Sequence, residues 1–152
     1  MRLTRFSDIG LRVLMYLARE PRTTSITVAE VASQFDIPHN HLVKVVGAMA
    51  KRGWIDALRG RHGGIRLAIS ADDIRIGMVL RALEGDLEAV DCEGIGCRLA
   101  DDCTLRNALR RGVQAFYNAM DEYTLAQMVG GNTGEHIIKM HRSFLQDTSK
   151  AA

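Results

Sequence analysis

The sequence lacks any uninterrupted run of about 18 apolar residues, the length that a membrane-spanning helix requires. Its first residues include arginines, but Asp8, Arg12 and Arg19 interrupt what would have to be the apolar core of a signal peptide. We therefore expect a cytoplasmic protein with no membrane partner. Cysteine is also scarce: three cysteines, an odd number in a chain that we do not expect to be secreted, argue against a disulfide framework and favour free thiols or metal ligands.

Catalytic groupings are missing as well. No Ser/His/Asp or paired-carboxylate catalytic grouping stands out, and the acidic residues of the second half are scattered. We expect no enzymatic activity.

The charge of the chain is unevenly distributed. The 152 residues are 47% hydrophobic and 25% charged, ordinary values for a globular protein, and the net charge is +2. Residues 1–70 hold 11 Lys/Arg and 5 Asp/Glu, a balance of +6, whereas residues 71–152 hold 9 and 13, a balance of −4. A basic half joined to an acidic half suggests that the first half binds a polyanion. The alternative is a charged face that is simply solvated.

Hydrophobic spacing predicts three helices in the first third of the chain. Residues 4–19 repeat apolar side chains at helical intervals behind Thr4, a residue type that caps helix N-termini. Thr27 and Glu30 have the spacing of a capping box, which predicts a short second helix. Pro38 follows a tight turn and suits the first position of a third helix.

A β-hairpin is expected next, with strands at residues 54–58 and 65–69. In the second run, apolar residues alternate with Arg66 and Ala68, the period of a half-buried strand. The tip between the strands is basic and rich in glycine: Arg59, Gly60, Arg61, His62, Gly63, Gly64. Two helices joined by a tight turn and followed by a basic hairpin indicate a winged helix-turn-helix.

The second half of the chain reads as helices around one irregular segment. The pattern predicts a helix at residues 76–84, no periodic structure at 86–103, and a long helix from 104 to about 128. The tail from residue 134 is expected to be at most weakly helical. The fold class is therefore mainly α with a small β-hairpin.

The third helix and the hairpin tip are the expected DNA contacts. In a helix-turn-helix the second helix enters the major groove, and its N-terminal residues face base edges. The residues expected there are His39, Asn40, His41 and Lys44. Asn40 can pair with an adenine edge, and Lys44 can reach a phosphate or a guanine. The alternative for the two histidines is that they only cover the helix end.

On the hairpin tip, Arg59, Arg61, His62 and Gly63 are expected to meet the minor groove, where narrow A·T stretches concentrate negative potential. Two exposed arginines so close together repel each other unless a polyanion binds them. A solvated tip is the alternative.

Cys92, Cys97 and Cys103 lie within 12 residues around Gly94 and Gly96. Thiolates are soft ligands for zinc, copper or iron–sulfur clusters. Structural zinc prefers closer cysteine pairs and a fourth Cys or His, so the wider spacing favours a cluster. Clusters normally take four protein ligands, which leaves one position for another group. Zinc binding and redox-active or inert thiols remain the alternatives.

These features together resemble the winged-helix iron–sulfur transcription regulators, the family that includes IscR and NsrR. The resemblance covers essentially the whole chain, and its motifs are residues 3–8 (LTRFSD), 59–64 (RGRHGG), 83–85 (LEG) and the cysteine triplet. The cysteine spacing and the acidic Asp8 resemble the nitric-oxide-sensing NsrR branch most closely. The IscR branch uses a histidine after its last cysteine, where this sequence has Asn107.

The resemblance implies a homodimer formed through the long helix. It also implies a four-iron four-sulfur or two-iron two-sulfur cluster held by Cys92, Cys97 and Cys103, with Asp8 of the other subunit completing it. The alternative for Asp8 is a first-turn acid that stabilises its helix. The expected divisions are a winged helix-turn-helix domain at 1–85, a cluster-binding loop at 86–103, a dimerisation helix at 104–129 and a C-terminal tail at 130–152.

The function expected from this resemblance is transcriptional repression. The homodimer would bind a pseudo-palindromic operator in double-stranded DNA while its cluster is intact, and would release DNA when nitric oxide nitrosylates the cluster. One alternative is a regulator of the same family that responds to cluster supply or to iron. An alternative of another class is an iron–sulfur carrier or assembly protein whose basic half is incidental.

Overall fold

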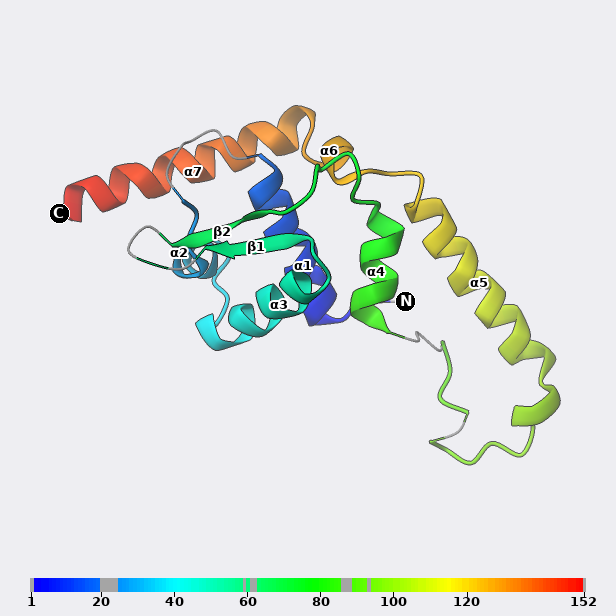
Figure 1. Cartoon of the computed structure of the whole chain (residues 1–152). Coiled ribbons are helices and arrows are strands. Elements are labelled where there is room, and N and C mark those ends of the chain that lie inside the picture. The colour runs from blue at the N-terminus through cyan, green and yellow to red at the C-terminus, as the bar shows by residue number, and fades with distance from the viewer. Residues whose placement is uncertain are drawn as a thin grey trace.

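The computed structural model describes residues 2–19, 25–58, 60, 63–85, 89–92 and 94–151. Its elements are α1 (Arg5–Ala18), α2 (Val28–Gln34), α3 (His39–Lys51), β1 (Ile55–Leu58), β2 (Gly64–Leu67), α4 (Ile76–Glu84), the short 3-10 helix η1 (Ala100–Asp102), α5 (Thr104–Met120), α6 (Leu125–Met128) and α7 (Gly131–Ala151) (Figure 1). The mainly helical fold with one small hairpin confirms the expected class. Among the described helices, none combines the length and the apolar character needed to cross a membrane.

Helices α1, α2 and α3 share one core, and both N-terminal caps expected from the sequence are present. The Thr4 hydroxyl accepts the backbone N–H of Ser7 (3.3 Å), and the Thr27 hydroxyl accepts that of Glu30 (3.1 Å). Pro38 precedes α3 instead of forming its first residue. The fully buried side chains of this core include Leu14, Tyr16, Val31, Leu42 and Met49.

The β1–β2 hairpin is antiparallel and places Leu58 opposite Gly64. It is joined to the segment before α2, because the N–H of Ile65 donates to the Ile26 carbonyl over 2.7 Å. A side chain at Gly64 would collide with that carbonyl, so the close approach requires glycine there. This contact holds the hairpin against the three-helix core as the wing of a winged helix-turn-helix.

The expectation of one unbroken helix up to about residue 128 is wrong. Helix α5 stops earlier, and a separate helix, α6, follows Thr124. Thr124 and Gln127 form a capping box, and the N–H of Leu125 donates to the carbonyl of Ile74 (2.8 Å). These contacts occupy backbone groups that a continuous helix would use internally, so the chain turns at this point.

The expectation of a weakly helical tail is wrong as well, because residues 131–151 form α7. Most of α7 is exposed, but Ile137 and His141 are buried, with 5% and 0% of their surface exposed. Helix α7 packs on α2. Tertiary contacts therefore stabilise a helix that its composition alone does not predict.

Helix α5 and the preceding loop extend away from the rest of the chain, as Figure 1 shows. Helix α4 connects the two parts, since it packs on α1 on one side and on α5 on the other. A side chain at Gly77 would collide with the backbone carbonyl of Tyr117, so the two helices cross at close range. The loop that holds the three cysteines lies at the far end of α5.

Candidate DNA-binding surface and cysteine loop

Helix α3 presents one polar face to solvent. Its opposite face is buried and comprises Leu42, Val45, Val46 and Met49. His39, Asn40 and Lys44 are exposed, as expected for residues that contact DNA. His41 is half-buried, and its ring centroid lies 6.5 Å from that of Phe6 on α1. The structure therefore brings three of the four sequence-predicted residues of this helix onto one accessible surface.

Two further residues on this surface were missed in the sequence. Val43 is 46% exposed, although its neighbours in sequence, Leu42 and Val45, are buried. Gly47 lies one turn later, and a side chain there would meet no atom within 4 Å. Hydrogen bonds to base edges come from polar side chains, a class to which neither residue belongs. The signal for Val43 in the sequence is an apolar residue outside the i, i+3, i+4, i+7 pattern of the buried face.

The hairpin tip is partly outside the described residues. Arg59, Arg61 and His62 lie there, so their expected contacts with the minor groove remain predictions. Gly60 has a φ of +106°, and the N–H of Gly63 donates to the Gly60 carbonyl over 2.9 Å.

The only basic residue of β2 has an acidic partner on the facing strand. Arg66 lies directly opposite Asp56, with Nη2 3.2 Å from Oδ2. Its charge is therefore balanced within the hairpin, and any positive potential of the wing must come from the tip.

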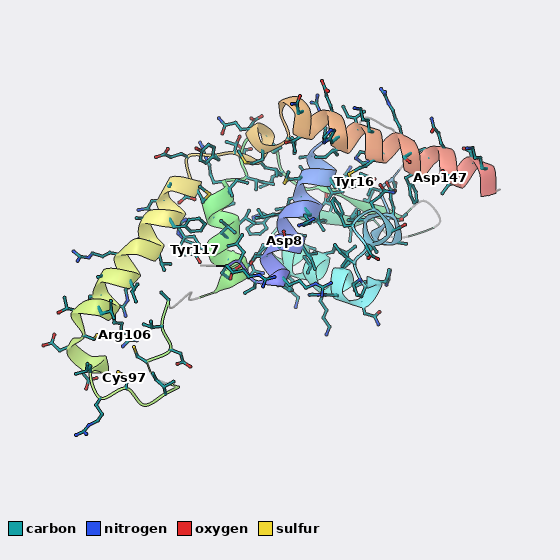
Figure 2. All side chains as sticks on the ribbon, turned by 180° about the vertical axis from the view of Figure 1, so that it is seen from behind. Asp8, Tyr16, Cys97, Arg106, Tyr117 and Asp147 are labelled. Carbon is teal, nitrogen blue, oxygen red and sulfur yellow. The ribbon has the colours of Figure 1, made fainter. Side chains whose placement is uncertain are left out.

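Asp8 is located in the first turn of α1 and is 49% exposed. Its Oδ1 accepts a hydrogen bond from Arg12 Nε at 3.0 Å. Together with Arg2, Leu3 and Arg5 it lines an open hollow at the start of the chain. Figure 2 shows Asp8 within the helical body and Cys97 far from it, beyond α5. Within one chain the two sites are not brought together.

None of the three cysteines forms a disulfide, and the loop that carries them is shaped by turns. Cys92 is buried, and Cys97 and Cys103 are partly exposed. The N–H of Cys97 donates to the Cys92 carbonyl (2.9 Å), and that of Gly94 donates to Asp91 Oδ1 (2.7 Å). In the described part of the chain, no three His, Cys, Asp or Glu side chains converge as a site for a single metal ion.

Cys103 is the N-terminal cap of α5. Its Sγ accepts the backbone N–H of Arg106 at 3.4 Å. This hydrogen bond fixes Cys103 at the junction between the cysteine loop and α5.

The start of the cysteine loop is tied to the start of α1. Glu84, the last residue of α4, accepts hydrogen bonds from the backbone N–H (2.8 Å) and the hydroxyl (3.1 Å) of Thr4, the cap of α1. The same end of the chain carries Asp8, one turn further on. The end of α4, where the cysteine loop begins, is therefore linked to the N-terminus of α1.

A second polar contact ties α4 to α5. Arg81 forms an ion pair with Asp121 (2.6 Å) and donates to Asn118 (3.0 Å), and its guanidinium lies 5.2 Å from the centroid of the Tyr117 ring. Tyr117 is buried, and burial raises the pKa of its hydroxyl above 10.0. The negative charge of Glu84 raises this pKa further, whereas the charge of Arg81 opposes the shift.

Comparison with solved structures supports the winged-helix architecture. The chain is similar to CymR (YrzC), the global cysteine regulator of B. subtilis, with 22% identity, a TM-score of 0.68 and coverage of 84% of this chain and 95% of that chain. The oxidised form of Staphylococcus aureus CymR is 23% identical, with a TM-score of 0.68 and coverage of 84% of this chain and 95% of that chain. IscR of T. potens is 20% identical, with a TM-score of 0.67 and coverage of 85% of this chain and 86% of that chain. At these identities the likeness shows the fold.

The family is shown by the sequence itself. Residues 3–131 match the profile of the Rrf2 family, described as an iron-dependent transcriptional regulator. The match includes the winged helix-turn-helix, the cysteine loop, α5 and α6. This chain belongs to the Rrf2 family of DNA-binding transcriptional regulators, which are not enzymes.

Proposed function

We propose that this chain is an iron–sulfur-dependent repressor of the NsrR type, which binds its operator as a homodimer and releases it in response to nitric oxide. The observation that carries this proposal is the arrangement of three cysteines without disulfides on one loop, with Cys103 capping α5 and the loop's start tied to α1 through Glu84. A sensor needs a reactive group linked to the DNA-binding half of the protein, and these contacts link the loop to α1, on which α3 packs.

The donor set fits an iron–sulfur cluster of four or two irons. Cys92, Cys97 and Cys103 provide soft thiolate ligands, and none of them is consumed in a disulfide. Asp8 of the partner subunit is the proposed fourth ligand. Its carboxylate is half-exposed and lines an open hollow, so it is accessible to a second chain. A bound cluster would supply the site at which nitric oxide reacts.

The homodimer is proposed to form along α5. Its apolar stripe comprises Leu105, Leu109, Val113, Phe116 and Met120, of which the last three are partly buried against the core of the same chain. At the other end of the stripe Leu105 is 64% exposed, and Ile95 and Leu99 on the cysteine loop are 76% and 69% exposed. Exposed apolar side chains that gather on a helix and the adjoining loop are typical of an interface between subunits. Pairing of two copies would cover it and bring each loop to another chain.

DNA contact is assigned to α3 and the wing. We place His39, Asn40, His41 and Lys44 at the major groove, and Arg59, Arg61, His62 and Gly63 at the minor groove. Val43 adds an apolar contact of the kind that recognises a thymine methyl group. Two-fold symmetry then requires half-sites whose centres lie about 34 Å, or a multiple of that, apart.

One alternative within the family has support. The family description names iron dependence, which favours a regulator that responds to iron or cluster supply instead of nitric oxide. The two functions differ in their trigger. In an iron-responsive regulator, loss of the cluster changes the affinity for DNA. Nitric oxide then has no effect on DNA binding as long as the cluster remains intact.

The proposal is tested by anaerobic purification followed by absorption spectra and operator binding, with and without nitric oxide. We expect iron–sulfur absorption, operator binding by the cluster-loaded protein and release on addition of nitric oxide. Replacing any one of Cys92, Cys97 or Cys103 with alanine should abolish stable cluster binding. A wild-type protein that holds only stoichiometric zinc would exclude the proposal.

Asp8→Ala tests the proposed fourth ligand, with Arg12→Ala as its matched control. Both variants break the same exposed ion pair, which stabilises the fold by only about 0.3–0.5 kcal/mol, but only the first removes the carboxylate. We expect both proteins to fold and dimerise. Asp8→Ala should change the cluster spectrum and partly uncouple DNA release from nitric oxide, whereas Arg12→Ala should not. Identical spectra and nitric-oxide titrations for both variants would remove Asp8 from the site.

A further inference from the structure

The C-terminal helix α7 holds a buried polar cluster that the proposed sensing site does not use. Family similarity ends at residue 131, where α7 begins, yet α7 packs on α2 of the helix-turn-helix. Its residue His141 is completely buried in a helix whose other polar side chains are exposed. The cluster consists of His141, Tyr16 on α1 and Glu30 on α2, which are 0%, 0% and 2% exposed.

The contacts of His141 define its role. Its ring stacks on that of Tyr16, with centroids 3.9 Å apart and planes inclined by 27°. Its Nε2 lies 3.1 Å from the backbone carbonyl of Tyr16, and since a carbonyl only accepts, Nε2 must donate. That carbonyl belongs to the last turn of α1, where helical carbonyls have no amide partner within the helix. His141 therefore caps the C-terminal end of α1 from a distant part of the chain.

The same cluster reaches the first turn of α2. The Tyr16 hydroxyl donates to Glu30 Oε1 over 2.7 Å, and His141 Nδ1 lies 3.8 Å from that oxygen. A buried carboxylate is tolerated only where it is hydrogen-bonded, so the position of Glu30 depends on its partners. Figure 2 shows Tyr16 on α1 where that helix meets α7. One cluster thus connects α7, the end of α1 and the start of α2.

We infer that His141 is a positioning residue for DNA binding: through the Tyr16–Glu30 cluster, α7 holds α1 and α2 in the arrangement that presents α3 to the major groove. Helix α3 packs on both α1 and α2, so a rotation of α2 moves the face that carries Asn40 and Lys44. This inference builds on the DNA-binding function of the family and is independent of the cluster and of nitric oxide.

The test compares His141→Phe, His141→Gln and the exposed control Arg142→Ala. Phenylalanine keeps a buried ring stacked on Tyr16 but removes the donor, whereas glutamine keeps a donor that can reach the carbonyl. Circular dichroism first gives the unfolding temperature of each variant. Operator affinity is then measured by fluorescence anisotropy at several salt concentrations, at a temperature at which every variant is folded.

We expect His141→Phe to lower operator affinity about fivefold, the change that corresponds to one hydrogen bond, and His141→Gln and Arg142→Ala to remain within about twofold of wild type. The slope of log affinity against log salt should stay the same, because His141 is buried and contacts no phosphate. Wild-type affinity in folded His141→Phe would overturn the inference. An equal loss in the phenylalanine and glutamine variants would do so as well, since the donated hydrogen bond would then not be the cause.

Discussion

Replacing Tyr117 with phenylalanine should stabilise the protein. Tyr117 is 5% exposed, and its hydroxyl has no hydrogen-bond partner among the described residues. A buried polar group without a partner costs about 1–3 kcal/mol relative to its hydrated state. Phenylalanine removes this cost and keeps the ring that packs beside Phe116 and under the Arg81 guanidinium.

The expected gain is about 1 kcal/mol, the lower end of that range, because a side chain that relaxes slightly recovers part of the lost hydration. For a chain of this length it corresponds to an increase in Tm of roughly 2–4 °C. Thermal unfolding followed by circular dichroism measures it, with the cluster state matched between the two proteins.

The difference between the two proteins should grow above pH 10. The pKa of Tyr117 is raised in the folded protein by burial and by Glu84, against the opposing charge of Arg81. As the pH rises through 10.0, the unfolded wild-type chain releases this proton while the folded chain retains it, so wild-type stability falls. Phenylalanine has no proton to release. If Tyr117→Phe instead destabilises the protein by 1 kcal/mol or more at neutral pH, the hydroxyl has a partner and the reasoning fails.

Three further predictions concern DNA contact, helix packing and assembly. Val43→Ala should reduce the discrimination between bases at one position of the operator by about 1–3 kcal/mol and change the base preferred there, as measured by binding to a panel of operators that differ at single positions. An equal loss of affinity for every operator of the panel would exclude a base contact. Gly77→Ala should lower the free energy of unfolding by about 1–3 kcal/mol, because the added carbon collides with the Tyr117 carbonyl. An unchanged midpoint in denaturant unfolding would show that α4 and α5 can move apart without cost. Leu109→Asp should convert the homodimer to a folded monomer in analytical ultracentrifugation, since it places a charge in the α5 stripe, and a dimer that persists would place the interface elsewhere.

The sequence predicted elements whose signals are local. The bounds of α4 agree with the expected residues 76–84, because an apolar repeat and the terminal Gly85, which has a φ of +71°, define both its face and its end. Thr4 and Thr27 cap the helices that they were expected to cap, since a cap depends on residues within one turn. The buried face of α3, and with it the exposed positions Asn40 and Lys44, also followed from periodicity.

What could not be predicted depends on distant partners. The end of α5 is determined by hydrogen bonds between the segment around Thr124 and the segment before α4, about 50 residues earlier in the chain. Helix α7 depends on the burial of Ile137 and on contacts of His141 with α1 and α2, and a lone histidine in a polar tail gives no sign of them. The spacing of the three cysteines identified candidate ligands, but no pattern in one sequence shows how a loop meets a second subunit.

The energies of the contacts around the cysteine loop suit a switch. The Glu84–Thr4 hydrogen bonds join the loop's start to α1, and the Arg81–Asp121 ion pair joins α4 to the helix at the loop's other end. Hydrogen bonds to charged groups contribute about 1.5–3 kcal/mol, and partial exposure of these side chains reduces each to about 1 kcal/mol. The two hydrogen bonds and the ion pair together amount to about 3 kcal/mol, at the upper end of the 1–3 kcal/mol typical of coupling between two sites. In the proposed sensor, such a link would pass a loop displacement to α1 while leaving the DNA-bound and released arrangements both accessible, whereas a link several times stronger would hold the DNA-binding half in one arrangement whatever happened at the thiols.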